Sequence, residues 1–507
     1  MRSVTDGPPN FGVGSWIERR ARTAPDDVAL VGAGRTLTYA QLAVRIRRLA
    51  NGLRSLGVGQ GDRVAWMGPN HPAFLETFFA SGLLGAALAP VNHRLPPDQV
   101  RAVLEGAEPS ILVQHAGLDA PALPGSARSR LAVAGEIPGA VDFDVLVGDS
   151  PDDPVDTAVG MDDVCLLPHT SGTTGTPKRI LLTHANVTWN VVNFLSCAEF
   201  RSTDVTVAIA PFFRVGGVGV NVLPVLFMGG TVVVPEHGGP DEIVELVERH
   251  RVTVGFGNPD SLDALLRTER WPTADLSSLR FVITGGAPVP ERLVRAYLLR
   301  GVRLVQGYGL SEAAPLALLL DPDTALRKIG AAGRPPLLVD VRIVGPDGAD
   351  VETGATGELL VRGPNVMAGY RNRPEATREA LSADGWLRTG DAARRDEDGD
   401  VWIVDRVADR IESAGRIVYP GDVERVLMDH PAVVDVGVVG VPGEPDGGLV
   451  AFVVPTASGA TGDDLLAFAG ERLAPHEVPA SVRFVERLPR SSVGKLVRSE
   501  LRALALT

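Results

Sequence analysis

The chain alternates strand-like and helix-like segments between Thr231 and Gln306, and this alternation restricts the fold more than any other feature. The segments run in order as strand Thr231 to Val234, helix near Asp241 to His250, strand Val252 to Phe256, helix from Pro259, strand Arg280 to Thr284, helix from Pro290 and strand Val302 to Gln306. Successive strand-helix-strand units have right-handed crossovers and build a parallel sheet. The sequence therefore predicts an α/β fold.

The two ends of the chain predict different kinds of domain. Near the start, Thr38 and Gln41 form a capping box before an amphipathic helix that stops at Gly57, and a strand follows at Arg63 to Met67. After Asp405, shorter helices and strands are mixed, which is typical of a small α+β domain. We predict a large N-terminal domain with parallel-sheet βαβ subdomains over 1–404, a hinge over 405–408 and a small C-terminal α+β domain over 409–507.

Composition excludes several classes of protein. The formal charge is −13 without a block of consecutive Lys and Arg, which argues against nucleic acid or an anionic membrane surface as the main partner. The two cysteines, Cys165 and Cys197, cannot form a disulfide framework, and the N-terminus lacks the apolar core of a signal peptide, so we predict a cytoplasmic protein. Residues 215–235 carry no charge, but their glycines, Asn221 and Pro224 favour a buried core over a membrane span.

A segment rich in hydroxyl groups, Thr170 to Lys178, lies between two apolar stretches. Its five hydroxyls, two glycines and one ammonium suit an oxyanion-rich ligand such as a polyphosphate. A Walker A loop is excluded because β-branched residues follow the lysine where a helix would have to begin. A solvated turn remains the alternative at this point.

Two glycine-rich turns follow predicted strands, at Thr284 to Ala287 and at Gln306 to Gly309. Ligands of parallel sheets bind beyond the carboxyl ends of the strands, where glycine lets the backbone approach them closely. Tyr308 offers a flat face on which a base could stack. Two ordinary turns are the alternative interpretation.

Four segments spread over most of the chain together resemble a known family: Thr170 to Lys178, Gln306 to Glu312, Gly385 to Asp391, and Pro489 to Leu496. They are similar, in the same order, to the phosphate loop, the Gly-Tyr-Gly-x-Thr-Glu motif, the ribose motif and the C-terminal lysine motif of the acyl-adenylate-forming superfamily. That superfamily includes acyl-CoA synthetases, aryl-CoA ligases, luciferases and the adenylation domains of peptide synthetases. Thr284 to Pro288 and Asn372 to Thr377 further resemble medium- and long-chain fatty-acyl-CoA ligases.

The resemblance implies a site for ATP and Mg²⁺, with Lys178, Glu312 and Lys495 as catalytic residues. Glu312 and Thr174 would hold Mg²⁺, a hard cation that prefers oxygen ligands. Lys495 would stabilise the charge that develops when a substrate carboxylate attacks the α-phosphorus of ATP and expels pyrophosphate. The implied nucleotide-binding residues are Thr170, Ser171, Gly172, Thr173, Thr174, Gly286, Ala287, Gln306, Gly307, Tyr308, Ser311, Asp391 and Arg406, of which Asp391 would accept hydrogen bonds from the ribose hydroxyls with support from Arg406.

The resemblance also implies where the acid and its acceptor bind. The small domain is expected to be mobile: it would rotate after adenylation, withdraw Lys495 and build a channel for the second nucleophile around Ala414 and Gly415. The positions implied for the acid pocket are Trp189, Phe212, Arg214, Phe256 and Gly286.

The chain departs from the family pattern at four positions. Where Pro-x-Phe-His is usual, it has Pro211-Phe212-Phe213-Arg214, so a permanent cation replaces a neutral aromatic gate. We hypothesise that Arg214 recognises a carboxylate, either the reacting one or a second anionic group; the alternative is that it turns outward to solvent. The other departures are Ala408 at the hinge, Arg179 after the phosphate-loop lysine, and Glu477 where a basic residue is common.

These features predict an AMP-forming ligase that converts a fatty or aromatic carboxylic acid to an acyl-adenylate and passes the acyl group to coenzyme A. One alternative is an amide bond synthetase that transfers the acyl group to an amine. A second is a non-catalytic nucleotide-binding protein on the same fold, against which the intact Lys178, Glu312, Asp391 and Lys495 argue. The sequence leaves the identity of the acid and the oligomeric state open.

Overall fold

The computed structural model describes residues 10–506, apart from 120, 170–176, 323, 414, 442–447, 458 and 491–495. Contacts between residues divide the chain into two compact units. The first unit comprises Met1–Asp340 and Val361–Leu387, and the second comprises Val341–Leu360 and Arg388–Thr507. The second unit thus begins upstream of the segment 405–408, and a hinge at 405–408 stays a prediction.

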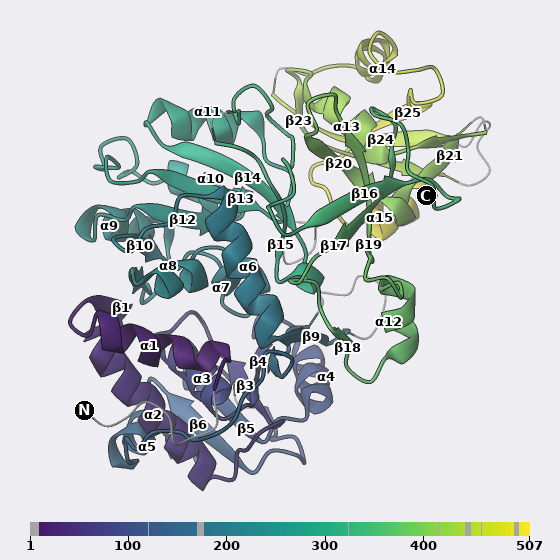
Figure 1. Ribbon diagram of the computed structural model, residues 1–507. Coiled ribbons are helices and arrows are strands. Elements are labelled where there is room, and N and C mark those ends of the chain that lie inside the picture. Colours follow the sequence, from purple (N-terminus) through teal and green to yellow (C-terminus); the bar gives the residue numbers. More distant parts are fainter. Residues whose placement is uncertain are drawn as a thin grey trace. The chain divides into compact units, whose positions relative to one another are not determined.

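An eight-stranded sheet, called sheet I, forms one half of the first unit (Figure 1). Its strands follow the order β15 (Leu316–Leu319), β14 (Arg303–Gly309), β13 (Phe281–Gly285), β12 (Val254–Gly257), β10 (Val205–Val207), β11 (Thr231–Val233), β1 (Val28–Gly32) and β2 (Arg35–Thr38). The strands from β14 to β1 pair in parallel, and the edge strands β15 and β2 are antiparallel. The predicted parallel sheet is confirmed, although β10 separates β11 from β12.

Helices α9 (Pro240–Arg249), α10 (Pro259–Leu266) and α11 (Glu291–Leu299) alternate with the strands of sheet I and bury one face of it. Their apolar residues pack with the strands around Trp271 and Tyr297, whose ring centres lie 4.8 Å apart. The predicted strand-helix alternation therefore supplies the core of this half of the unit.

A second eight-stranded sheet, sheet II, forms the other half. Its strands follow the order β18 (Gly369–Tyr370), β9 (Ile180–Thr183), β8 (Val164–Leu166), β4 (Ala87–Val91), β3 (Arg63–Met67), β5 (Ile111–His115), β6 (Ser129–Val133) and β7 (Val141–Asp142). From β8 to β7 the pairing is parallel, whereas β9 pairs antiparallel with β8 and β18. The short β18 brings a distant segment next to the strand that follows the hydroxyl-rich segment.

Helix α6 (His184–Cys197) contacts strands of both sheets, and Figure 1 shows it running between them. Thr183 and Asn186 form a capping box at its start. Further along, Asn190 donates from Nδ2 to the carbonyl of Gly219 and accepts from the amide of Leu316 through Oδ1. A buried amide side chain that is bonded on both sides fixes α6 against α7 (Val215–Gly219) and the edge strand β15 of sheet I.

The remaining helices of the first unit cover the sheets. The predicted helix after Thr38 is confirmed as α2 (Tyr39–Ser55), with its capping box. The uncharged stretch 215–235 folds into short buried elements, and among the residues described here no helix is long and apolar enough to cross a membrane. The other helices are η1 (Val13–Ser15), α1 (Trp16–Thr23), α3 (Pro72–Leu83), α4 (Pro97–Ala107), α5 (Phe143–Asp149), α7 (Val215–Gly219), α8 (Val222–Met228), η2 (Ser311–Ala313) and α12 (Pro374–Ala380).

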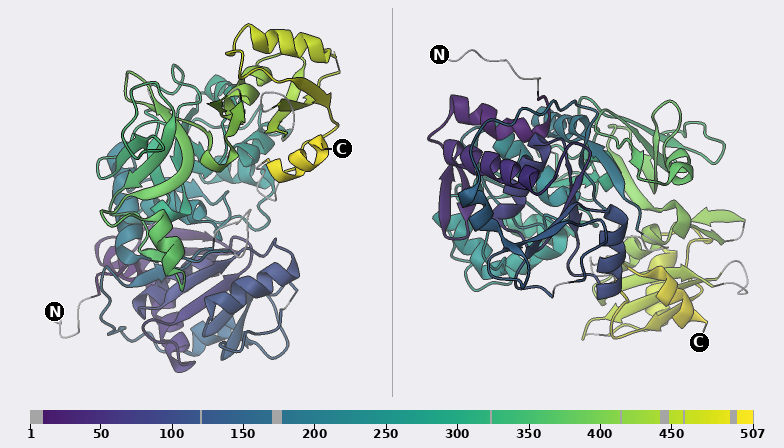
Figure 2. Two further views of the ribbon diagram at one scale, coloured as in Figure 1. Left: turned by 90° about the vertical axis from the view of Figure 1, so that its right-hand side faces the viewer. Right: turned by 90° about the horizontal axis from the view of Figure 1, so that it is seen from below.

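The second unit contains most of a four-stranded sheet and an α+β portion that follows it (Figure 2, green to yellow). The four strands are β16 (Asp340–Val344), β17 (Gly357–Arg362), β19 (Leu387–Arg395) and β20 (Val401–Arg406). The α+β portion comprises η3 (Val407–Asp409), the hairpin β21 (Ile411–Ser413) and β22 (Arg416–Val418), α13 (Pro420–Met428), β23 (Val433–Gly440), β24 (Leu449–Pro455), α14 (Gly462–Gly470), β25 (Ser481–Phe484) and α15 (Arg498–Ala505). The mixture of short helices and strands predicted after Asp405 is confirmed.

Candidate active site

Adjacent strand ends of sheet I gather the glycine-rich turns that the sequence predicted to bind a nucleotide. Gly285 of β13 pairs with Gly307 of β14, and a Cβ on Gly285 would lie 2.4 Å from the carbonyl oxygen of Gly307. The next residue, Gly286, is exposed with φ +84, and a Cβ added there would meet nothing within 4 Å. Gly285 is therefore required by strand packing, whereas Gly286 leaves open space beside the backbone.

The structure thus brings together five of the predicted nucleotide-binding residues at the carboxyl ends of two neighbouring strands. They are Gly286, Ala287, Gln306, Gly307 and Tyr308. Ser311 begins η2, directly after β14. Parallel sheets bind ligands at this edge, so the position suits a nucleotide. The individual contacts of these residues with ATP stay predictions.

Glu312 and Lys178 lie on either side of a residue that sequence reasoning missed, Tyr370. The Tyr370 hydroxyl donates to Oε1 of Glu312 at 2.8 Å, and the Lys178 ammonium lies 4.9 Å from the centre of the Tyr370 ring. Burial, and then the charge of Glu312, raise the pKa of the Tyr370 phenol, so it remains a donor. Pairing of Tyr370 with Ile180 holds the ring beside Lys178. The only signal in the sequence was its place two residues before the recognised segment Asn372 to Thr377.

The side chain of Glu312 fits the Mg²⁺ that the sequence implies. Its carboxylate is a hard oxygen donor, and the Tyr370 hydrogen bond occupies only one of its two oxygens. Across the described part of the chain, no group of three or more His, Cys, Asp and Glu residues is arranged to hold a metal ion. One carboxylate suits Mg²⁺, which proteins commonly hold through one or two carboxylates together with substrate phosphates.

Asp391 and Arg406, the predicted ribose-binding pair, face each other in the second unit. They are cross-strand partners in β19 and β20, and Arg406 Nε lies 2.9 Å from Oδ1 of Asp391. Asp391 is buried, whereas the Arg406 side chain is half exposed. The strand register therefore brings together two residues that the sequence linked only through the family resemblance.

Of the remaining predicted catalytic and channel residues, the structure describes only Gly415. Lys495, Ala414 and the phosphate-loop residues Thr170, Ser171, Gly172, Thr173 and Thr174 lie outside the described residues. Gly415 is described: it is exposed, with φ +71 and no atom within 4 Å of an added Cβ. The roles of all these residues stay predictions.

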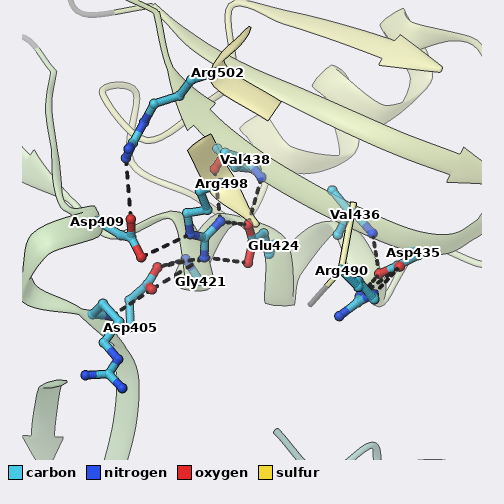
Figure 3. Close-up of polar contacts among 11 residues, drawn as sticks. Asp405, Asp409, Gly421, Glu424, Asp435, Val436, Val438, Arg490, Arg498 and Arg502 are labelled. Atoms are coloured by element: carbon cyan, nitrogen blue, oxygen red, sulfur yellow. Dashed lines mark hydrogen bonds and ion pairs between the residues drawn. The ribbon is translucent and has the colours of Figure 1, made fainter. Parts of the chain in front are cut away.

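The described residues that flank 491–495 form ion pairs (Figure 3). Arg490 contacts Asp435 at 2.8 Å. Arg498 pairs with Asp405 at 3.1 Å, with Asp409 at 3.7 Å and with Glu424. Because Asp405 and Arg498 are only about a tenth exposed, these charges are stabilised chiefly by one another.

The residues predicted to line the acid pocket divide between the core and the surface. Trp189 on α6 is 38% exposed, whereas Phe256 in β12 is buried and its ring lies 3.5 Å from a Cβ placed on Gly216. Phe212 is fully buried and packs on Phe74 with ring centres 5.0 Å apart. The ring beside Arg214 belongs instead to Phe213, which the sequence did not single out.

Arg214 is only partly exposed, and its guanidinium lies 5.8 Å from the centre of the Phe213 ring. Arg94, from the loop after β4, lies at the same distance from that ring. Burial and the nearby charge of Arg94 lower the pKa of Arg214. The side chain therefore lies against the protein rather than extending outward to solvent.

Arg179, the residue after Lys178, packs along the C-terminal half of α4, from Ala102 to Gly106. Its Nη2 donates to the carbonyl of Ala102 at 2.9 Å, and a Cβ on Gly106 would lie 1.5 Å from the same nitrogen. Arg371 pairs with Glu108 at the same helix end. Carbonyl groups at a helix C-terminus attract cations, so the departure at Arg179 has a local structural partner.

Two family models match the chain. The model described as AMP-binding enzyme covers residues 17–371, and the model described as AMP-binding enzyme C-terminal domain covers residues 422–495. The first alone spans more than half of the sequence and contains two of the four motifs, Thr170 to Lys178 and Gln306 to Glu312. The second contains the lysine motif apart from its last residue, and the ribose motif lies between the two matched regions.

Curated relatives match over nearly their full length. A feruloyl-CoA synthase from an Amycolatopsis species is 46% identical over 498 residues, which cover 97% of this chain and 99% of the relative. An indoleacetate–CoA ligase from Aromatoleum aromaticum is 39% identical over 502 residues, covering 96% and 97%. Both names describe ligases that use coenzyme A.

Solved structures agree. A Mycobacterium tuberculosis fatty acyl CoA synthetase superimposes with a TM-score of 0.80 at 31% identity, covering 97% of this chain and 98% of that one. An O-succinylbenzoate coenzyme A synthetase from Bacillus subtilis, in complex with ATP and magnesium ion, gives 0.84 at 28% identity, covering 96% and 99%.

Together the fold, the site and these relatives define the activity. The protein is an ATP- and Mg²⁺-dependent ligase that activates a carboxylic acid as its acyl-adenylate, releases pyrophosphate and transfers the acyl group to coenzyme A. The relatives do not favour the amine acceptor or the non-catalytic alternative. The chain belongs to the AMP-binding enzyme family.

Proposed function

We propose that the protein is an aryl-CoA ligase of the cytoplasm, whose acid substrate is aromatic rather than fatty. The observation that carries the proposal is the near-full-length similarity to a feruloyl-CoA synthase at 46% identity and to an indoleacetate–CoA ligase at 39%. A long-chain fatty-acid–CoA ligase from Mycobacterium tuberculosis is less similar, at 32%. The cytoplasmic location is supported by the free cysteines Cys165 and Cys197.

The side chains near the predicted acid pocket support an aromatic substrate. Phe213 and Phe256 lie close to the short helix α7, and Trp189 exposes part of its indole on α6. Aromatic rings bind one another in offset or edge-to-face arrangements that add about 0.5–1.5 kcal/mol to simple burial. Such a setting discriminates planar acids from flexible chains.

In the proposed reaction, an oxygen of the acid attacks the α-phosphorus of ATP, and pyrophosphate leaves. Lys178 and the phosphate-loop residues would bind phosphate oxygens, and Lys495 would stabilise charge that develops between the two anions. Glu312, oriented by Tyr370, would supply the carboxylate for Mg²⁺, which neutralises phosphate charge when bound. The thiol of coenzyme A would then attack the acyl carbon and release AMP, with Ala414 and Gly415 on its path.

The division of labour between domains belongs to the same proposal. Residues 1–404 would bind ATP and the acid, 409–507 would carry Lys495, and 405–408 would act as the hinge. Ala408 at that hinge replaces a charged residue, which changes the balance between domain orientations without altering the adenylation chemistry.

A pyrophosphate-release assay over benzoic, cinnamic, arylacetic and straight-chain fatty acids, with and without coenzyme A, tests the proposal. We expect release with aromatic acids, and a thioester identified by mass when coenzyme A is present. The Lys495→Ala variant should lose adenylation, whereas Lys328→Ala, at a lysine outside the four motifs, serves as a control for lysine removal. Release with fatty acids alone would refute the aromatic assignment.

A further inference from the structure

Arg94 and Arg214 form a pair of cations that has no carboxylate partner among the residues that the structure describes. Each guanidinium lies 5.8 Å from the centre of the Phe213 ring. The imidazole of His93 also packs edge-on against this ring, with ring centres 5.5 Å apart. Among the described residues, no carboxylate lies within ion-pair distance of either arginine, and neither side chain donates a hydrogen bond to another described group.

A partly buried cation without a counter-ion is costly. Desolvation disfavours the charge, and a second cation nearby adds repulsion. Arg214 is partly buried, whereas Arg94 beside it is exposed. Two other partly buried arginines have carboxylate partners: Arg45 contacts Glu76 and Asp144, and Arg280 contacts Asp204. The Arg94–Arg214 pair is therefore poised to bind an anion from outside the chain.

The order of strands in sheet I locates this pair relative to the nucleotide motifs. β14 and β13 carry the predicted nucleotide-binding turns, β12 carries Phe256, and β10 leads into Phe213 and Arg214. Neighbouring strands are about 4.8 Å apart, so β10 lies about 10 Å from β13 along the edge. Phe256 packs toward Gly216, two residues after Arg214, and so lies between the two ends of this row.

Hydrogen bonds from sheet II fix the loop that carries Arg214. Asn70, in the loop after β3, donates to the carbonyls of Ala208 and Ala210 and accepts from the amide of Phe212. Arg94 follows the neighbouring strand β4. The loop that carries Arg214 is thus bonded to the loop after β3, and Arg94 follows a strand that pairs with β3. Both arginines belong to the first unit.

We propose that Arg94 and Arg214 bind an anionic oxygen substituent, a carboxylate or a phenolate, at the end of the acid opposite its reacting carboxylate. The inference rests on the proposed aryl-CoA ligase function and narrows its substrate class to aromatic acids with a second ionisable oxygen. Arginine suits this role because its fork of N–H groups donates to such oxygens and its charge is attracted to the face of the Phe213 ring.

The test compares cinnamic acids with hydrogen, methyl, hydroxyl or carboxyl at the para position, using kcat/KM for pyrophosphate release. Hydrogen bonds between charged groups contribute about 1.5–3 kcal/mol, so we expect the para-carboxyl acid to exceed the para-methyl acid by roughly 10- to 100-fold. The ratio should approach one in Arg214→Gln and fall in Arg94→Gln. Because both values of the ratio come from the same variant, a loss of active enzyme lowers them equally and leaves the ratio unchanged.

Arg101→Gln is the matched control, since Arg101 is an exposed arginine on α4 with no ion pair among the described residues. It should leave the ratio at the wild-type value. Measurements between about pH 6 and 9 distinguish the two kinds of anionic oxygen. If the site binds a phenolate, the preference for the para-hydroxyl acid over the para-methyl acid rises with pH. If it binds a carboxylate, the preference for the para-carboxyl acid over the para-methyl acid does not change with pH.

Equal kcat/KM for all four acids in the wild type would overturn the anion site while leaving the aryl-CoA ligase function intact. An unchanged ratio in Arg214→Gln would overturn it as well. Activity with fatty acids but with none of the aromatic acids would refute the proposed function, and the anion site with it.

Discussion

The protein contains two arginine clusters that differ in one respect, whether their charge is neutralised within the chain. In the second unit, Arg498 contacts three carboxylates, those of Asp405, Asp409 and Glu424 (Figure 3). In the first unit, Arg94 and Arg214 flank Phe213 with no described carboxylate beside them. The first arrangement is complete by itself, and the second lacks an anion. The difference separates arginines that hold a structure from arginines that bind a ligand.

Replacing an arginine by a neutral residue should change the free energy of unfolding in opposite ways in the two clusters. A buried ion pair gains little over an apolar pair, but removing one partner strands the other charge. Removing an unpaired cation leaves no other charge without a partner. Stability measurements on the two clusters therefore test the comparison directly.

The largest effect is expected for Arg498→Met. It leaves Asp405 and Glu424 buried without a cation, and breaking a buried pair in this way costs about 3–5 kcal/mol. We expect the amides of β23 and β24 to exchange faster with deuterium, since α13, which carries Glu424, packs on β23. Hydrogen exchange followed by mass spectrometry measures this loss in the second unit separately from the first.

Arg502→Gln is the control for that experiment, because Arg502 is 40% exposed and its one ion pair among the described residues is with Asp409, at 3.5 Å. Exposed pairs contribute about 0–1 kcal/mol, so exchange should hardly change. Equal protection in Arg498→Met and the wild type would remove the distinction between the two clusters.

The sequence predicted individual helices and strands better than it predicted which of them lie side by side. The helix after Thr38 and the strand from Arg63 to Met67 follow from local capping and alternation, and both are confirmed. The place of β10 between β11 and β12 does not follow, because strand order depends on how helices pack on the sheet rather than on residues within a strand.

The site shows the same limit. Glu312 and Lys178 belong to recognisable motifs, but Tyr370 reaches them only through the pairing of β18 with β9, a contact that no local pattern encodes. Arg214 was visible as a departure from a motif. Arg94 was not, since its proximity depends on the pairing of β4 with β3 and on the bonds from Asn70 to the loop that carries Arg214.

The next largest effect is expected on catalysis, at Glu312, whose charge accepts a hydrogen bond within the site. Tyr370→Phe removes the hydroxyl that donates to Glu312 at 2.8 Å. A hydrogen bond to a charged group contributes about 1.5–3 kcal/mol, so kcat/KM for ATP should fall by about tenfold or more. When Mg²⁺ is titrated at fixed ATP, the variant should need a higher Mg²⁺ concentration than the wild type to reach half of its maximal rate.

A double-mutant cycle with Glu312→Gln identifies the cause of the Tyr370 effect. If the phenol acts through Glu312, the two substitutions together cost less than the sum of each alone. Strict additivity would show that Tyr370 acts elsewhere, for example through Lys178, whose ammonium lies 4.9 Å from the ring.

A smaller effect uses His93 as a probe of the field around the arginine pair. Burial, then the charge of Arg94, lower the pKa of His93 from 6.5 to about 4. The folded state thus binds fewer protons, so this contribution to stability is complete above about pH 6.5 and is lost as the pH falls toward 4. Because the ring is only half-buried, we expect about 1 kcal/mol over that range.

Nuclear magnetic resonance of the imidazole protons measures the His93 titration. Arg94→Gln should raise the pKa of His93 because the nearby charge of Arg94 is removed, whereas Arg101→Gln should leave it unchanged. A pKa that does not move in Arg94→Gln would mean that burial alone sets it and that the field is weaker than the geometry indicates.

The smallest effect, and the sharpest contrast with Arg498, is expected for Arg214→Met. Methionine keeps the apolar contact with Phe213 and removes a partly buried cation that has no described carboxylate partner. The free energy of unfolding of the first unit should therefore stay within about 0.5 kcal/mol of the wild type, or rise. Hydrogen exchange in α8 and β10 measures it on the same scale as Arg498→Met. A loss comparable to that of Arg498→Met would show that Arg214 stabilises the fold through its charge, and the two clusters would then be of one kind; a neutral result would leave ligand binding as the reason for keeping an uncompensated arginine at this position.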